Sequence, residues 1–133
     1  MVKQNNEIWT RGTRKSSVAR IRLCSGNGKL MVNGKSIDDF FAGHHRQKTE
    51  VMKPLAVAGH TNDYDIIATV SGGGVTGQSG ALRLGIARAI VQMDDKTKQP
   101  LRSRGFFTRD SRMVERKKPG QPKARKKFQY SKR

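Results

Sequence analysis

The chain has 133 residues, enough for one domain with a modest core, and hydrophobic residues make up 34% of it, which is low for a fully packed globule. Lysine and arginine number 28 against 10 acidic residues, and the formal net charge of +18 favours a polyanionic partner, most commonly nucleic acid. No apolar run approaches roughly 20 residues, so we do not expect a membrane protein. Because the N-terminus lacks a signal-peptide core and the chain has one cysteine, we do not expect a disulfide-rich secreted protein either.

The first elements in chain order are two strands. Residues 7–12 predict a short strand, and residues 16–26 predict a longer one. In the longer strand Ile21 faces one way while Arg20 and Arg22 face the other, because side chains alternate along a strand. We therefore expect a half-buried strand that carries cations on its outer face.

Two turns follow these strands. The pair Asn27 and Gly28 tolerates positive φ and predicts a hairpin, from which residues 29–32 return as the partner of the second strand. Residues 33–36 predict a further turn.

Two helical segments come next. Ser36 followed by Asp39 predicts a capped helix start, and a second helix is expected over residues 46–58. Pro54 lies inside that segment, where a proline would kink or end the helix. The side chains expected to face inward in this helix are Val51, Met52, Leu55 and Ala56.

The second half of the domain predicts a strand over residues 64–70, a glycine loop, a long helix, and a short helical turn within residues 98–110 that ends at Gly105. This order predicts an α+β domain with a mainly antiparallel sheet and helices on one face. The inward residues of the strand are Ile66, Ala68 and Val70. The apolar stripe of the long helix is Leu82, Ile86, Ala89, Ile90 and Met93.

The glycine loop has the spacing of a nucleotide-binding P-loop. Gly72, Gly77 and Ser79 stand at the expected positions, but Gln78 replaces the lysine of that motif, and no aspartate follows a second aliphatic strand to bind magnesium. Nucleotide hydrolysis is therefore disfavoured. Two interpretations stay open: the loop and the helix N-terminus hold a phosphodiester, or the glycines only form a tight strand-to-helix connection.

The end of the chain has a different composition. Residues 112–133 contain ten basic residues and one acidic residue, and so carry half of the net charge. Such a segment cannot bury enough surface to offset its ordering entropy, which predicts an extended arm that becomes ordered on a polyanion. A tail that only aids solubility is the alternative, although Phe128 and Tyr130 could stack on bases. We divide the chain into a globular domain, residues 1–108, and a basic C-terminal arm, residues 109–133.

No group of residues predicts catalysis, a metal or a cofactor. His44 and His45 are adjacent, so their side chains diverge, and with one cysteine a zinc site is not expected. Cys24 ends an apolar strand and is expected to be a small core residue rather than a nucleophile. The sequence therefore indicates a binding protein and not an enzyme.

Four segments carry motifs whose combination and order are highly specific: residues 11–23, 26–34, 72–90 and 106–133. Together they resemble the small-subunit ribosomal protein nine family, in its bacterial or organellar form. The resemblance implies the fold of the second domain of ribosomal protein five, a mainly antiparallel sheet with helices on one face and a left-handed β-α-β crossover. It also implies the extended basic C-terminal arm.

The same resemblance implies the partners. They are the three-prime major domain of the small-subunit ribosomal RNA, neighbouring proteins of the subunit head, and the anticodon stem-loop of the tRNA in the P site. The implied location is the ribosome of a bacterial cytoplasm or of an organelle, with no membrane partner.

The resemblance also assigns residues, and Tyr130 keeps the ring of the family's usual phenylalanine. The implied tRNA-binding residues are Tyr130, Ser131, Lys132 and Arg133. The expected rRNA-binding residues are Arg11, Arg14, Lys15, Gly73, Gly74, Gln78, Arg83, Arg109, Arg112, Arg116, Lys117, Lys118, Lys123, Arg125, Lys126, Lys127 and Phe128.

Two other function classes remain beside ribosome assembly and support of P-site tRNA. A free nucleic-acid chaperone or DNA-compacting protein would need only the charge, and it would tolerate shuffling of residues 128–133. A nucleotide hydrolase would turn over ATP with magnesium.

Overall fold

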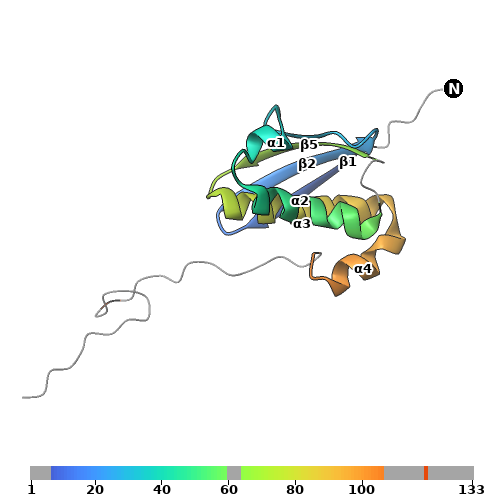
Figure 1. The fold of residues 1–133 in the computed structure, drawn as a ribbon. Helices are drawn as coiled ribbons and strands as arrows, with labels where there is room; N and C mark the ends of the chain where they lie inside the picture. Colours follow the sequence, from blue (N-terminus) through green and yellow to red (C-terminus); the bar gives the residue numbers. More distant parts are fainter. Residues whose placement is uncertain (1–6, 60–63, 107–118, 120–133) are drawn as a thin grey trace, which may run out of the picture.

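The computed structural model describes residues 7–59, 64–106 and 119, and its elements form one α+β domain (Figure 1). The strands are β1 (Ile8–Arg14), β2 (Ser17–Ser25), β3 (Leu30–Val32), β4 (Lys35–Ser36) and β5 (Tyr64–Ser71). The helices are α1 (Ile37–Phe40), α2 (His45–Ala58), α3 (Val75–Met93), the 3-10 helix η1 (Asp95–Thr97) and α4 (Lys98–Ser103).

The sheet has the strand order β1-β2-β5-β3-β4. β3 and β5 are parallel, and all other neighbours are antiparallel, which confirms the predicted fold class of an α+β domain with a mainly antiparallel sheet. Because α1 and α2 lie in the connection from β3 to β5, these elements form a β-α-β unit. Its left-handedness and the likeness to domain two of ribosomal protein five stay predictions. The arm, residues 109–133, lies outside the described residues except for Pro119.

The expected hairpin between β2 and β3 is wrong, because β5 lies between these two strands. β5 pairs with β2 from Val18 to Ser25, whereas β3 is only three residues long, so the long-range pairing offers more hydrogen bonds than the local one. The turn after β2 does form, and Gly28 has a φ of 96°. The Asn27–Gly28 pair thus predicted the turn correctly, but it did not predict that β3 pairs with β5.

Asp65 of β5 holds this turn. Its Oδ1 atom accepts hydrogen bonds from the backbone N–H groups of Asn27 and Lys29 at 2.9 and 3.0 Å. These bonds, led by the one from Lys29, place the pKa of the Asp65 carboxyl below its ordinary value. The carboxylate therefore accepts the backbone N–H groups of the turn that follows β2, which a neighbouring strand would otherwise accept.

The core lies between the sheet and α3, and α2 packs on α3 (Figure 1). The predicted inward residues of β5 are all buried. The predicted stripe of α3 is also correct, since its members are buried except for the half-buried Met93. α3 is buried on more than this stripe because it contacts the sheet on one side and α2 on another.

A close contact between β1 and α3 was not predicted. A Cβ atom on Gly12 would overlap the carbonyl oxygen of Ala81 and lie 2.6 Å from the amide nitrogen of Gly85. Next to this point the Thr10 hydroxyl donates to the Gly85 carbonyl at 2.8 Å. Strand and helix backbones can touch here only because side chains are absent or small.

The helices before β5 follow the predictions with two corrections. The Ser36 hydroxyl caps α1 by accepting from the Asp39 amide, as expected. Pro54 does not end α2, which continues to Ala58, and Gly59 closes it with a φ of 74°. Val51 and Leu55 are buried, but Ala56 is exposed, because the α2 face that packs on α3 is narrower than the predicted stripe.

Cys24 is half-buried on the outer face of β2, where its Sγ lies 3.6 Å from the Asp65 carbonyl oxygen, so its expected place in the core is wrong. It alternates with the inward Leu23 and therefore shares the face of Arg22.

The part of the chain that the structure describes contains no helix long and apolar enough to cross a membrane.

Candidate nucleic-acid interface

α3, with α2 packed on it, covers one face of the sheet, and the described residues leave the opposite face across β1, β2 and β5, called here the open face, exposed to solvent (Figure 1). Strand pairing places its side chains in rows across β1, β2 and β5, since directly paired residues point to the same side. The first row is Trp9, Arg22 and Ile67; the second is Arg11, Arg20 and Thr69; the third is Thr13, Val18 and Ser71.

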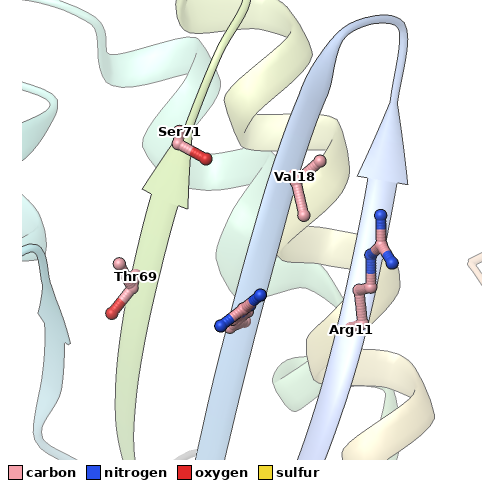
Figure 2. Close-up of a pocket in the computed structure, with 5 residues that line it drawn as sticks. Arg11, Val18, Thr69 and Ser71 are labelled. Atoms are coloured by element: carbon pink, nitrogen blue, oxygen red, sulfur yellow. The ribbon is translucent and has the colours of Figure 1, made fainter.

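A shallow depression of about 410 Å³ lies on the open face. In Figure 2 its lining side chains stand on three adjacent strands, with Arg11 on β1, Val18 on β2, and Thr69 and Ser71 on β5. Arg20 completes the lining. Guanidinium groups suit phosphate, and hydroxyl groups can both donate to and accept from a base edge or a ribose hydroxyl.

The charge of the open face is mostly uncompensated. Glu7 pairs with Arg22, and this hydrogen bond, together with the attraction between the charges, raises the pKa of the guanidinium above its ordinary value. Asp65 is occupied by the turn after β2. Neither Arg11 nor Arg20 has a carboxylate partner among the described residues, so both cations are available to an external anion.

The glycine loop packs against the turn between β1 and β2. Gly72 and Gly73 have φ angles of 74° and 62°, and the Ser17 hydroxyl donates to the Gly72 carbonyl at 3.0 Å. A Cβ on Gly73 would overlap the Ser17 hydroxyl oxygen, and one on Gly77 would come within 2.7 Å of it. Packing therefore explains these two glycines, which supports the interpretation as a tight connection at their positions.

Gly74 has a different environment. It is the N-cap of α3 and has no side-chain cap, and a Cβ atom on it would meet no described atom within 4 Å. Gln78 donates to the Gly72 carbonyl at 3.3 Å and so closes the loop from within. Backbone N–H groups at such a helix N-terminus can donate to an anion, and Gln78 stands where a P-loop has its lysine.

A second hollow, of about 290 Å³, lies where α2, α3 and the end of β1 meet. Its basic lining residues are Arg14, Arg46 and Arg83, and its other lining residues are Gln47, Glu50, Thr76 and Ser79. The stem of Arg14 lies over Gly80, where a Cβ atom would overlap it. The hollow can therefore accept an anion between two helices at the same end of the domain as the glycine loop.

Arg83 is already engaged within the domain. Its guanidinium donates to Glu50 at 2.8 Å and lies over the Phe106 ring at 5.4 Å. Glu50 also accepts from Lys53 at 2.6 Å, and these hydrogen bonds, Lys53 first, hold the pKa of the Glu50 carboxyl below its ordinary value against the effect of partial burial. Arg83 thus joins α3 to α2 and presents only part of its donor set to an external anion.

The predicted RNA contacts fall into two groups in the described part of the chain. Arg14, Lys15, Gly73, Gly74, Gln78 and Arg83 lie around the glycine loop and the second hollow, whereas Arg11 lies on the open face. RNA contact by any of these residues stays a prediction. The remaining predicted residues lie outside the described residues: Arg109, Arg112, Arg116, Lys117, Lys118, Lys123, Arg125, Lys126, Lys127, Phe128, Tyr130, Ser131, Lys132 and Arg133.

Sequence reasoning did not assign several interface residues. Trp9, Arg20, Arg46, Thr69 and Ser71 belong to the two surfaces described here. The alternation of β2 had already placed Arg20 on an outer face. Only the pairing of β2 with both β1 and β5 brings it beside the hydroxyl groups of β5.

Comparisons with known proteins agree on one family. The family described as "Ribosomal protein S9/S16" matches residues 12–133. "Small ribosomal subunit protein uS9" of Azobacteroides pseudotrichonymphae is 52% identical over 122 residues, which cover 92% of this chain and 94% of that protein. The protein of the same name from Chlorobaculum tepidum is 51% identical over 126 residues, covering 95% and 97%.

Proposed function

This chain belongs to the ribosomal protein S9/S16 family, and from this premise we propose that it is a structural constituent of the small ribosomal subunit that binds ribosomal RNA in the subunit head. The family is one of ribosomal structural proteins, not of enzymes. Its partners would be the three-prime major domain of the RNA and neighbouring head proteins, and its location the ribosome.

The observation that carries the proposed RNA binding is the placement of cations on the domain. Arg11 and Arg20 stand on the open face without a carboxylate partner among the described residues, and Arg46 lines the second hollow beside the N-terminus of α3. Together with the net charge of +18, these sites allow the domain to contact phosphates on two sides.

We further propose that the arm reaches the P site and that its last residues contact the tRNA. Arg133 can hold a phosphate through both arms of its guanidinium, and Lys132 adds a second charge. The support for this assignment is the sequence of the chain end, because the arm lies outside the described residues apart from Pro119.

Deleting Ser131, Lys132 and Arg133 should lower the affinity of small subunits for P-site tRNA by about 1–3 kcal/mol, the range for a charge-assisted contact. The deletion removes two of 28 basic residues and no described core residue, so folding and assembly should persist. The measurement is filter binding of tRNA to mRNA-programmed subunits that carry either the wild-type or the shortened chain.

The matched control keeps the charge and shuffles the order of residues 128–133. A specific tRNA contact should be weakened by the shuffle as well as by the deletion, because the guanidinium is displaced. Equal tRNA affinity of all three chains at several magnesium concentrations would refute the tRNA contact and leave the arm as an RNA-binding segment only.

A further inference from the structure

We propose that the open face of the sheet binds unpaired nucleotides of RNA, with Trp9 as the ring on which a base stacks. This inference rests on the proposed function and specifies the kind of RNA that one surface takes. The face carries an exposed aromatic ring, two available guanidinium groups and two hydroxyl groups on three adjacent strands.

Trp9 is the most unusual residue of this face. The residue is 66% exposed, although tryptophan is buried to a large extent in most folded proteins. Ile67, in the same row, is 46% exposed, so the two side chains form an apolar area in the open. Trp9 lies on the edge strand β1, whose pairing with β2 fixes the backbone, so the ring loses little freedom when a base stacks on it.

Arg22 lies over the Trp9 ring and helps to hold it in place. Its guanidinium lies 5.8 Å from the centre of the Trp9 ring and also forms an ion pair with Glu7. A cation held at a tryptophan ring favours the observed ring position, and because Glu7 neutralises Arg22, the net positive charge next to an incoming nucleotide comes from Arg11 and Arg20. Trp9 and Arg22 are paired residues of β1 and β2, so the strand register maintains the contact.

The neighbouring row supplies phosphate contacts. Arg11 and Arg20 lie two residues along β1 and β2 from the Trp9 row, a distance of about 7 Å on a strand face. A nucleotide can span this distance between its base and a phosphate. Thr69 and Ser71 add hydroxyl groups in reach of a base edge or a ribose hydroxyl.

The combination favours unpaired RNA over a duplex. In a duplex the bases are stacked inside the helix, so an exposed indole would face phosphates and would have no base on which to stack. Unpaired bases present their faces, and aromatic side chains on a sheet stack on them. A protein partner would fit the apolar pair Trp9 and Ile67, but it would also have to neutralise Arg11 and Arg20, so we assign the face to RNA.

Trp9 is the single tryptophan of the chain, so its fluorescence reports on this face alone. We would titrate the full chain with a single-stranded RNA of about eight nucleotides, in the range of site sizes for such surfaces, and with a fully paired RNA duplex of the same length. Raised salt would reduce the contribution of the basic arm. The single strand should quench the emission in a saturable way, and the duplex should leave it nearly unchanged.

Variants then test the residues, with RNA anisotropy as the measurement. Trp9→Ala should weaken binding of the single strand at least about fivefold, and Trp9→Phe should retain part of the affinity because a ring remains. Arg20→Gln should weaken it more than the charge-matched control Lys96→Gln, which lies on η1. The three residues changed in these four variants are all exposed, so circular dichroism should show unchanged folds.

Two results would overturn the inference. One is unchanged emission on binding together with equal affinity of Trp9→Ala and wild type for the single strand. The other is quenching of Trp9 by neighbouring ribosomal proteins and not by RNA, which would make the open face a protein contact. Binding of full-length small-subunit RNA by the wild-type chain would still stand in both cases, so failure of the inference is distinguishable from failure of the proposed function.

Discussion

Replacing Gly12 by alanine should destabilise the folded domain by about 3 kcal/mol, at the upper end of the cost of overpacking a core. The new Cβ atom would overlap the Ala81 carbonyl oxygen and press on the Gly85 amide. Both are backbone atoms of a buried helix, so no side-chain rotation can relieve the overlap. β1 and α3 would have to separate, which would also break the hydrogen bond from Thr10 to Gly85.

Denaturant unfolding of the full chain measures this loss, and Gly74→Ser is the matched control. Gly74 has a φ of −102°, an ordinary value, and open space for a Cβ atom among the described residues. Serine is also a favourable N-cap, so the control should keep or slightly raise the stability. If Gly12→Ala were as stable as Gly74→Ser, the packing of β1 on α3 described above would be incorrect.

Removing residues 112–133 should greatly lower both RNA affinity and its dependence on salt. The segment contains ten basic residues, half of the excess charge. Each phosphate contact contributes roughly −0.7 to the slope of log affinity against log salt on single strands and roughly −0.9 on duplex DNA. Loss of several contacts should therefore reduce the slope by several units and the affinity by orders of magnitude at moderate salt.

The control for this truncation is a chain in which residues 112–133 are shuffled. It keeps the composition and should restore most of the salt dependence on simple RNA, because counterion release depends on charge and not on order. A truncated chain with an unchanged slope would show that the arm is not an RNA-binding element and that the globular domain carries the affinity.

Local signals in the sequence predicted most elements well. The alternation around Ile21 identified β2 and the face that it buries, because side chains on a strand point alternately to its two sides. The spacing from Leu82 to Met93 identified α3, since i, i+4 and i+7 positions share one side of a helix. Ser36 identified the start of α1 through a hydrogen bond within four residues.

Long-range pairing could not be predicted from these signals. β5 separates β2 from β3, and nothing in residues 25–32 indicates that a strand more than thirty residues later inserts there. The small residues Gly77, Ala81 and Gly85 recur every four positions along α3, and in hindsight they mark the side that approaches β1 and the turn after it. The predicted apolar stripe, which runs from Leu82 to Met93, contains none of these three positions.

Part of the candidate interface could be predicted from local signals, and the rest depends on long-range strand pairing. Positive charge and the glycine loop were visible in the sequence, and Arg14, Lys15, Gly73 and Gly74 do lie at one end of the domain. The sequence predicted helices on one face and cations on the outer face of β2, but not which side chains gather on the open face, because that depends on the pairing of three strands from two distant segments. Trp9 gained significance only when its exposure was known.

Sedimentation through sucrose gradients at raised salt tests most directly whether the chain is a structural constituent of the small subunit. The tagged full chain would be produced in cells, and each fraction would be probed for the tag and for the ribosomal RNA of the small and of the large subunit. We predict that the chain stays with small subunits, because sites on two sides of the domain and the basic arm hold it there together. A chain that remained at the top of the gradient, or followed nucleic acid in every fraction alike, would contradict this function.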